Sequence, residues 1–265
     1  MENSKIQWTD HTFNPWMGCT KVSAGCKHCY AEALMDRRLG RVEWGPTGTR
    51  VRTGHANWRK PVKWAVDACM ADRRDRVFCA SLADVFELHE SIEAEWRLDL
   101  WALVESTKEL DWLLLTKRPE NVGQLVPLQW HVNGFPRNVW IGTTVEDQDA
   151  ADQRIPLLKQ YPASVRFLSC EPLVGPVFLG DHLDGIDWVI VGGESGPEAR
   201  VSDPSWFGSL IGECEERGVP VFVKQLGTRW AAELKLDDRK GGDMDEWPEA
   251  LCVRQQPTPQ NRRTT

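Results

Sequence analysis

The sequence is short of the features that would assign it to a membrane, secreted or disordered class. No apolar run reaches the roughly eighteen residues that indicate a membrane-spanning helix, and residues 1–10 lack the apolar centre of a signal peptide. We therefore expect no membrane contact and a cytoplasmic location. Charged residues make up 27% and hydrophobic residues 41% of the 265-residue chain, a balance that excludes disorder and collagen-like repeats.

Tyrosine is also scarce, with two residues against fourteen tryptophans. Tryptophan supplies a large apolar area for a core or for stacking surfaces. Trp112, Trp140 and Trp188 fall inside apolar runs, so we expect these three in the core. The chain has eight cysteines, and in a reducing compartment a disulfide framework is not expected. A cluster among them is therefore interpreted first as a metal site.

The net charge of −7 conceals a basic segment between Arg37 and Lys63. Its basic residues alternate with tryptophans and are Arg37, Arg38, Arg41, Arg50, Arg52, Arg59, Lys60 and Lys63, with Trp44, Trp58 and Trp64. Such a segment can bind phosphates and stack bases, which predicts a nucleotide or nucleic-acid partner. A solvated surface packed by its tryptophans is the alternative. The acidic chain as a whole disfavours strong nonspecific binding to duplex DNA.

Short apolar runs recur after residue 75, each followed by polar residues and then by a helical pattern. Their nearly continuous apolar character is typical of strands buried on both faces of a parallel sheet. The runs are residues 76–81, 111–116, 138–143, 165–169, 187–191 and 219–224. With a first strand near Lys5 to Trp8, they predict about seven β/α units and an α/β fold with a complete or partial TIM-type barrel. A doubly wound open sheet is the second interpretation.

The helical pattern and the composition predict how the chain is divided. Helical spacing predicts one helix over residues 92–104 behind Ser91 as N-cap, and another over 206–214 that ends before Gly218. We expect residues 1–228 to form the barrel. Within it, residues 14–30 are expected to form a cysteine-containing loop that holds a metal cluster, and residues 37–63 a basic insertion. Residues 229–265 are rich in charge, Gly, Gln and Pro. They are expected to be an extension that adds little to the core and frays at its end.

Polar side chains directly follow the apolar runs. In a barrel these residues lie on one face, where active sites form. Each one alone could cap a helix or form a turn, but the succession predicts an active-site rim. Cys69, Cys79, Cys170 and Cys214 are expected to be small buried side chains. Cys170 is the exception to test, because it lies between Ser169 and Glu171 on this rim.

The most specific local pattern is the arrangement C-x6-C-x2-C formed by Cys19, Cys26 and Cys29. Three thiolates on a glycine-containing loop can converge on a thiophilic metal. A structural zinc site normally has four protein ligands, and the fourth could be His11, His28 or His55. An iron-sulfur cluster with three cysteines instead leaves one iron open to a substrate or cofactor.

Here the sequence resembles the radical S-adenosylmethionine enzymes, which carry three cysteines in the loop after the first strand of a partial barrel. Their usual spacing is C-x3-C-x2-C, so the first gap of this chain is longer. Tyr30 directly follows Cys29, as in members similar to spore photoproduct lyase. A closer resemblance, over about residues 5–227, is to a largely uncharacterised phage and prophage family of three-cysteine-motif proteins. It is carried by the segments NPWMGC, GCKHCYAE, SLADVFE, LLTKRPENV, WIGTTVEDQ, SCEPLVG, VIVGGESG and VKQLG.

The resemblance implies an enzyme in which Cys19, Cys26 and Cys29 ligate a 4Fe-4S cluster that cleaves S-adenosylmethionine to a 5'-deoxyadenosyl radical. Such an enzyme needs a reducing electron donor and a substrate, which the resemblance does not identify. By analogy, Asp84 would bind the methionine ammonium and Lys117 its carboxylate. The other residues expected to bind the cofactor are Thr143, Thr144, Glu146, Glu171, Gly192, Gly193 and Glu194. The alternative is a zinc-containing protein without catalytic activity that docks nucleic acid or a partner.

Overall fold

A parallel sheet of seven strands forms the centre of the structure, a computed structural model that describes residues 4–258. The strands follow one another across the sheet in chain order. They are β1 (His11–Phe13), β4 (Asp75–Cys79), β5 (Leu110–Thr116), β6 (Val139–Thr144), β7 (Val165–Cys170), β8 (Trp188–Gly192) and β9 (Val221–Gln225). No ladder joins β9 to β1 within residues 4–258, so the sheet is an open half-barrel. The predicted α/β fold with a partial TIM-type barrel is confirmed.

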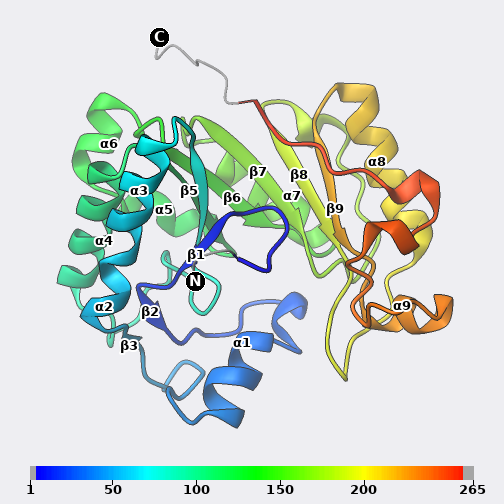
Figure 1. The fold of residues 1–265 in the computed structure, drawn as a ribbon, viewed down its shortest axis with the longest axis horizontal. Coiled ribbons are helices and arrows are strands. Elements are labelled where there is room, and N and C mark those ends of the chain that lie inside the picture. The colour runs from blue at the N-terminus through cyan, green and yellow to red at the C-terminus, as the bar shows by residue number, and fades with distance from the viewer. Residues whose placement is uncertain (1–3, 259–265) are drawn as a thin grey trace.

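Helices surround this sheet, with α3 to α6 on one flank and α8 and α9 on the other (Figure 1). The helices are α1 (Tyr30–Glu32), α2 (His55–Trp58), α3 (Lys60–Met70), α4 (Ala94–Ser106), α5 (Val122–Leu125), α6 (Leu128–Asn133), α7 (Gln148–Leu158), α8 (Pro204–Arg217) and α9 (Thr228–Leu234). A π-helical turn, Ala33–Arg38, continues α1. Short 3-10 turns span Ala24–Cys26, Pro119–Asn121, Gly180–Leu183, Met244–Glu246 and Glu249–Leu251.

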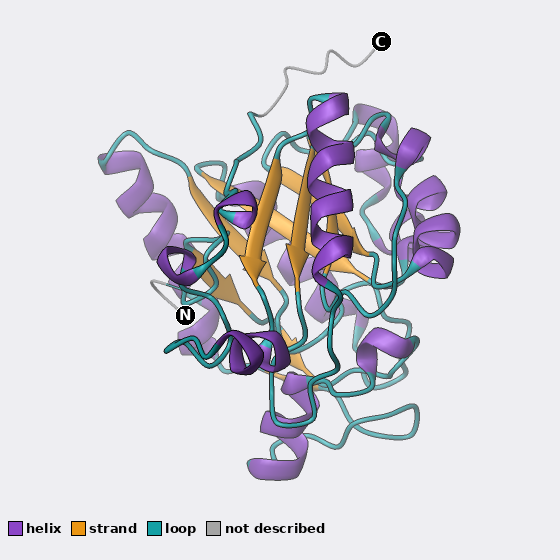
Figure 2. Ribbon diagram, turned by 90° about the vertical axis from the view of Figure 1, so that its right-hand side faces the viewer, coloured by secondary structure: helices purple, strands orange, loops and turns teal. Residues whose placement is uncertain are grey.

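Parallel pairing brings the carboxyl ends of the seven strands to one edge of the sheet. In Figure 2 the arrowheads point toward this edge, which faces the loop-rich lower part of the molecule. A small antiparallel sheet of β2 (Trp16–Met17) and β3 (Val51–Arg52) brackets the cysteine loop. All the connections that follow the strands therefore meet at the same edge as that loop.

Local signals in the sequence explain where several helices begin and end. Asp147 caps α7 by accepting a hydrogen bond from the N–H of Ala150 at 2.9 Å. Gly218, with φ of +64°, ends α8 in the left-handed conformation that glycine tolerates. The predicted helix over 92–104 is α4, but its N-cap is Glu93 rather than Ser91, because the chain between them is still turning.

The inner face of the half-barrel is filled by aromatic and branched side chains. Each strand from β4 to β9 contributes to this layer, whose buried members are Trp8, Phe78, Leu113, Trp140, Val165, Phe167, Trp188, Ile190 and Phe222. A second and larger cluster lies between the sheet and the helices and includes Trp112. The prediction that Trp112, Trp140 and Trp188 belong to the core is confirmed, since each is at most 2% exposed.

The first strand lies later in the chain than the sequence predicts. Residues 5–8 form bends and a turn, and β1 begins at His11. Trp8 turns inward and packs against Phe78 with ring centroids 4.7 Å apart. In the sequence, the apolar character of Trp8 indicates a strand residue, but Trp8 instead closes the inner layer. This explains why the sequence predicts the first strand too early in the chain.

The C-terminal segment returns to the sheet after α9. Trp230, Trp247 and Leu251 belong to the larger core cluster, and Arg254 forms an antiparallel bridge with Phe222. The segment therefore contributes more to the core than its composition predicts. The division of the chain at residue 228 stays a prediction, and the expected fraying falls on residues 259–265, outside the described residues.

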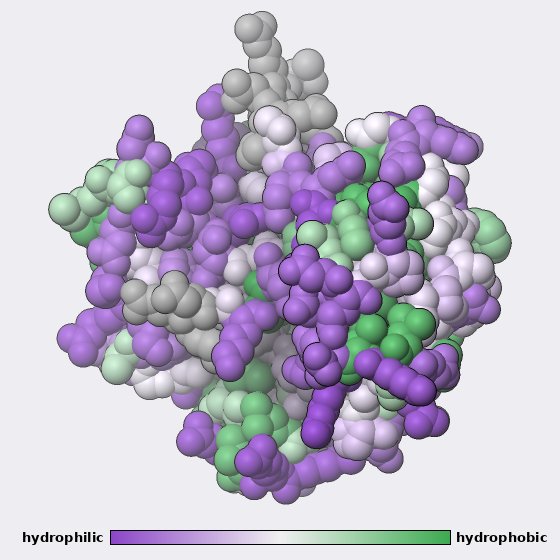
Figure 3. Space-filling view, turned by 45° about the vertical axis from the view of Figure 1, so that its right-hand side comes forward, coloured by the Kyte–Doolittle hydropathy of each residue, from purple (hydrophilic) through white to green (hydrophobic). Residues whose placement is uncertain are grey.

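Hydrophilic side chains cover most of the face seen in Figure 3, and apolar side chains reach that surface in smaller patches. Between residues 4 and 258, no helix combines the length and the apolar character that a bilayer crossing requires.

Candidate functional site

A cavity of about 220 Å³ opens at the carboxyl edge of the parallel sheet. Its wall is formed by the segments that end or follow the strands from β4 to β9 and by the cysteine loop. The polar and charged side chains on this wall belong to Cys19, Thr20, Lys21, Cys26, His28, Cys29, Tyr30, Ser81, Asp84, Thr116, Lys117, Arg118, Thr144, Ser169, Glu171, Glu194, Ser195 and Lys224. Active sites of parallel barrels form at this edge, and the strand-end residues meet here as expected.

Gly18 fixes the start of the cysteine loop against the end of β4. It forms a parallel bridge with Ala83, and its N–H donates to the carbonyl of Leu82 at 3.0 Å. Its φ of +106° favours glycine, and a Cβ there would lie 2.6 Å from the carbonyl oxygen of Thr49. Only glycine allows this close contact, and the contact places the next residue, Cys19, on the cavity wall.

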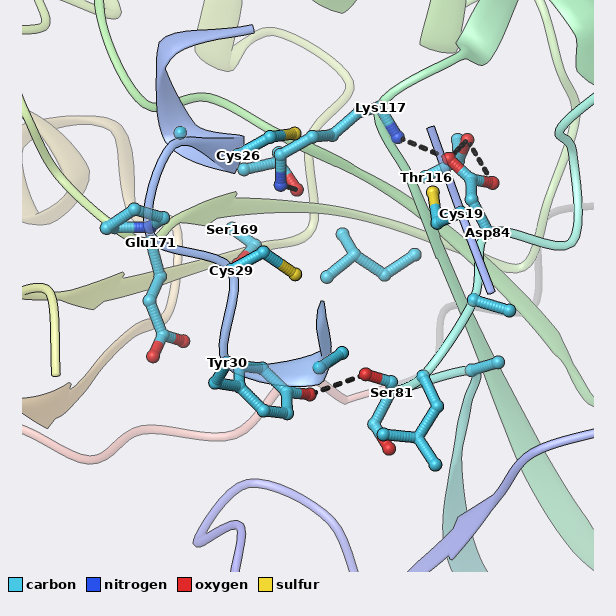
Figure 4. A pocket seen from close by; sticks show the side chains of 18 of the residues that line it. Cys19, Cys26, Cys29, Tyr30, Ser81, Asp84, Thr116, Lys117, Ser169 and Glu171 are labelled. Atoms are coloured by element: carbon cyan, nitrogen blue, oxygen red, sulfur yellow. Dashed lines mark hydrogen bonds between the residues drawn. The ribbon is translucent and has the colours of Figure 1, made fainter. Parts of the chain in front are cut away.

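The three thiols of the motif face one space (Figure 4). Cys26 ends a 3-10 turn and Cys29 directly precedes α1, so the short C-x2-C spacing carries both around one bend. All three cysteines are partly exposed. Burial, assisted by nearby carboxylates, raises the pKa of Cys19 to about 12, and burial raises the pKa of Cys29. Metal binding therefore has to displace protons from these thiols.

None of the remaining cysteines lines the cavity. Cys79, Cys170 and Cys214 are buried, whereas Cys69 and Cys252 are exposed. The prediction that Cys69 is buried is wrong, because it lies on the outer face of α3. The prediction that Cys170 is a small buried side chain is confirmed, although it lies between two rim residues. Strand side chains alternate between faces, and burial raises the pKa of the Cys170 thiol well above its usual value.

Two arginines and two carboxylates form a buried network behind the first cysteine. Arg50 donates two hydrogen bonds to the Glu87 carboxylate, at 2.7 and 2.8 Å, and the exposed fractions of the two side chains are 0% and 2%. Arg118 donates to Asp84 at 3.1 Å and to Glu87 at 3.3 Å. The N–H of Thr20 donates to Glu87 at 2.8 Å, which ties the cysteine loop to the network.

Asp84 lines the cavity, but its carboxylate already accepts several hydrogen bonds from the protein. The donors are the Thr116 hydroxyl at 2.8 Å, the N–H groups of Phe86 at 3.0 Å and Lys117 at 3.1 Å, and Arg118. These contacts join the segment after β4 to the end of β5. Asp84 therefore fixes the backbone from which Lys117 enters the cavity.

Lys117 places an ammonium group on the cavity wall. Its Nζ donates to the hydroxyl of Thr144 at 3.0 Å. Behind it, Glu146 is fully buried and pairs with Arg154 at 2.7 Å. Burial alone would raise the pKa of Glu146, but Lys117 and Arg154 outweigh it, so the pKa of that carboxyl is lowered. The wall is thus positively charged on this side with a fixed carboxylate behind it.

The wall formed by the later strands carries two ion-paired carboxylates. Glu171, after β7, pairs with Lys224 at the end of β9. Glu194, after β8, pairs with Arg200 at 2.6 Å and lies 3.3 Å from Nδ1 of His28. Burial alone would raise the pKa of Glu194, but the hydrogen bonds from Arg200 and His28 outweigh it and lower that pKa. The His28 contact joins the cysteine loop to this wall.

Gly193 brings the backbone after β8 close to a neighbouring segment. A Cβ there would lie 2.1 Å from the carbonyl oxygen of Leu226, so only glycine fits. The backbone of Gly193 consequently forms part of the cavity wall.

Most residues predicted to bind a cofactor reach the cavity. Those that line it are Asp84, Lys117, Thr144, Glu171, Gly193 and Glu194. Thr143, Glu146 and Gly192 are buried and are not among the lining residues. Thr143 instead donates to the carbonyl of Thr116 at 3.0 Å, which couples β6 to β5.

Sequence reasoning missed the roles of Arg118, Arg200 and His28. Arg118 follows β5 closely, so the sequence places it on the rim. Its partners lie in segments distant in the chain, and the sequence does not indicate them. His28 was considered only as a zinc ligand, and its contact with Glu194 spans most of the chain. Arg200 lies in a loop without a recognisable pattern, and no local signal predicts its pairing.

The basic segment 37–63 is partly neutralised inside the structure. Arg50 is buried in the network described above, so it cannot contact nucleic acid, which corrects the expectation for that residue. Arg52 pairs with Asp99 and lies 4.6 Å above the ring of Trp58. Trp64 is 1% exposed and stacks on His11. Arg50 and Arg52 are therefore structural, whereas the exposed basic residues of the segment are Arg37, Arg38, Arg41, Arg59, Lys60 and Lys63.

A second groove, of about 280 Å³, lies beside the first cavity and shares His28, Cys29 and Tyr30 with it. Arg37 and Arg38, on the π-helical turn, line this groove. Arg37 also pairs with Glu32 at 3.1 Å. The exposed start of the basic segment thus reaches the cysteine loop.

Within the described residues, no group of three His, Cys, Asp or Glu side chains is placed to hold a metal ion. Of the three histidines considered as zinc ligands, His11 contacts Asp75 at 3.1 Å and His28 contacts Glu194. The thiols share a cavity without forming the compact geometry of a site for a single ion.

Comparison with known proteins identifies a family but no activity. No curated protein matches the chain. A solved structure of a cysteine-to-serine mutant of spore photoproduct lyase is similar, with 14% identity and a TM-score of 0.47, over 71% of this chain and 57% of that chain. The chain spans little more than half of that protein, and a likeness of this size supports no conclusion about activity. Residues 3–254 match the family described as "Protein of unknown function (DUF5131)", and the chain belongs to that family.

Proposed function

We propose that the protein is a radical S-adenosylmethionine enzyme whose 4Fe-4S cluster is held by Cys19, Cys26 and Cys29. One observation carries the proposal: the three thiols share a cavity with the polar strand ends at the carboxyl edge of a parallel half-barrel. When bound, the reduced cluster would supply the electron that cleaves S-adenosylmethionine into methionine and a 5'-deoxyadenosyl radical.

The donor set of three thiols fits an iron-sulfur cluster. Thiolate sulfurs are the usual ligands of iron-sulfur clusters. A structural zinc ion needs four protein ligands, and of the histidines that could be the fourth, His11 and His28 already contact Asp75 and Glu194. Three cysteines also leave one iron for a cofactor.

Lys117 is assigned to the carboxylate of the methionine moiety. Its ammonium lies on the cavity wall and is held by Thr144, and a charge-assisted hydrogen bond to a carboxylate is among the strongest that a protein can offer. Asp84 supports this contact by fixing the backbone of Lys117. Its filled hydrogen-bonding capacity favours this positioning role over direct contact with the ammonium.

Of the two carboxylates on the later-strand wall, Glu194 already accepts four hydrogen bonds from Arg200 and His28, whereas Glu171 pairs with Lys224. We assign the methionine ammonium to Glu171, because a carboxylate paired with one lysine can accept further hydrogen bonds. The Thr144 hydroxyl can serve a further polar group, and the exposed backbone at Gly193 allows a flat base to approach closely.

The inner end of the cavity is apolar. Trp8 and Phe78 line it and belong to the buried aromatic layer of the half-barrel. An apolar wall keeps water away from a reactive centre, and this is the contribution that a radical reaction needs from the protein.

The adjoining groove supports a phosphate-bearing substrate such as a nucleotide or nucleic acid. Arg37 and Arg38 line it, and the ring of Tyr30, whose residue is 54% exposed, stands where it meets the cavity. Guanidinium groups bind phosphates, and an exposed aromatic ring can stack on a base. Arg50 and Arg52 take no part in this proposal.

Anaerobic reconstitution tests the proposed function. Incubation with iron and sulfide should give a brown protein with about four irons per chain. Added dithionite and S-adenosylmethionine should then yield 5'-deoxyadenosine, which mass spectrometry detects. A chain that takes up one zinc ion and no iron or sulfide would instead support the alternative of a zinc-containing docking protein.

A further inference from the structure

Arg118 touches a cysteine of the motif directly. Its Nη1 donates to Sγ of Cys19 across 3.6 Å, and the same guanidinium donates from Nη2 to the carbonyl oxygen of Thr20 at 2.7 Å. Arg118 thus contacts both the side chain of the first cysteine and the backbone that follows it. Within the described residues, no other arginine or lysine donates a hydrogen bond to a motif thiol.

The guanidinium is held rigidly from behind. Asp84 and Glu87 accept its hydrogen bonds, and Glu87 is itself fixed by Arg50. The Arg118 side chain is only 8% exposed. Since both Nη groups form two hydrogen bonds each, the position of the Nη1 atom next to the sulfur is set by the cysteine loop and by the segment after β4.

The charge of this group is secure. Arginine stays protonated in proteins, and this guanidinium pairs with Asp84 and Glu87. The first cysteine therefore faces a charged hydrogen-bond donor that offsets the Asp84 and Glu87 carboxylates behind it, whereas Cys26 faces the neutral hydroxyl of Ser23 at 3.9 Å. The three thiols of the motif are electrostatically unequal.

We infer that Arg118 is a positioning residue that fixes Cys19 and raises the reduction potential of the cluster bound there. This inference rests on the proposed function. Hydrogen bonds and positive charges at the ligand sulfurs stabilise the more electron-rich, reduced cluster. The first gap of the C-x6-C-x2-C motif is long. The contact of Arg118 with Cys19 and Thr20 holds the start of this gap against the edge of the sheet.

The test measures the midpoint potential of the reconstituted cluster by anaerobic titration with dithionite, followed by electron paramagnetic resonance. We expect Arg118→Gln to shift the potential to a more negative value. Arg118→Lys keeps the charge but cannot reproduce the fork, so we expect a smaller shift in the same direction. Arg97→Gln is the matched control, because Arg97 donates to the backbone of Val85 and Glu87 without contacting a cysteine.

Circular dichroism and iron content are measured for each variant, so that misfolding is recognised. Where Arg118→Gln does not fold, Arg118→Lys decides. Loss of the cluster from a folded Arg118 variant, with the cluster kept in Arg97→Gln, supports the positioning role. A wild-type potential in folded, cluster-bearing Arg118→Lys and Arg118→Gln overturns the inference alone, and so does an equal shift in Arg97→Gln. A wild-type chain that binds no iron or sulfide overturns the proposed function as well.

Discussion

Gly18 pairs with Ala83 in a parallel bridge, and this contact attaches the cysteine loop to the carboxyl end of β4. The loop is therefore an extension of the sheet edge rather than a separate module. The position of the Cys19 thiol depends on a backbone contact at the residue directly before it.

Replacing Gly18 by alanine should destabilise the protein by about 1–3 kcal/mol or more, because a strained backbone and a steric clash act together. Gly45→Ala is the matched control, since Gly45 has a similar φ of +113° but a Cβ added there would meet no atom within 4 Å. Urea unfolding should show a larger loss for Gly18→Ala. Equal losses of unfolding free energy in Gly18→Ala and Gly45→Ala would mean that the close approach of residue 18 to Thr49 does not affect stability.

Lys117→Met should weaken the binding of S-adenosylmethionine to the reconstituted protein by roughly 10- to 100-fold, because a charged hydrogen bond contributes about 1.5–3 kcal/mol. Iron content should stay at the wild-type level. Lys108→Met serves as the control, since Lys108 is exposed and precedes β5 at its opposite end. Titration calorimetry measures both. Unchanged affinity in Lys117→Met would remove Lys117 from the cofactor site.

Asp75 gives a prediction about pH. Hydrogen bonds from Arg73 outweigh the effect of burial and, with His11, hold the pKa of the Asp75 carboxyl below its usual value. Because the folded protein holds the charged form more strongly, this stabilisation is present above about pH 4 and is lost as the pH falls through the folded-state pKa.

Asp75→Asn should therefore cost about 1–3 kcal/mol at pH 7, and the difference from wild type should shrink as the pH falls below about 4. Thermal unfolding from neutral to acidic pH measures this difference. Asp67→Asn, in an exposed pair with Lys63, should have little effect at any pH. A difference for Asp75→Asn that does not vary with pH would contradict the assignment.

Arg38→Ala should weaken the binding of a single-stranded oligonucleotide and reduce the slope of log affinity against log salt by about 0.7, the value for one lost phosphate contact. Arg217→Ala, on α8, provides the control because Arg217 pairs with Asp181 and Asp184. Fluorescence anisotropy at several salt concentrations measures both. A wild-type affinity that does not change with salt would rule out phosphate binding in this groove.

Much of the sheet could be predicted because parallel buried strands leave a nearly continuous apolar signal. Each predicted run begins and ends within two residues of the corresponding strand from β4 to β9. The edge strand β1 has only three residues, so the apolar signal there came from Trp8 instead. Polar residues after each strand could be placed on one edge because parallel pairing brings those ends together.

The buried charge network could not be predicted. Arg50 stands in a basic segment and its composition indicates a surface residue, yet its partner Glu87 is 37 residues away. The contact between Arg118 and Cys19 spans 99 residues. Such pairs depend on how the loops pack at the sheet edge, and a single sequence has no local pattern for that. The link to phage proteins stays a prediction.

The central claim is that Cys19, Cys26 and Cys29 hold a 4Fe-4S cluster, and the iron and sulfide content after anaerobic reconstitution tests it most directly. We predict about four irons and four sulfides per chain for the wild type, the same for Cys69→Ala, and loss of the cluster for alanine at each motif cysteine. Equal contents in the Cys69 and motif variants, or zinc in place of iron in the wild type, would contradict the claim.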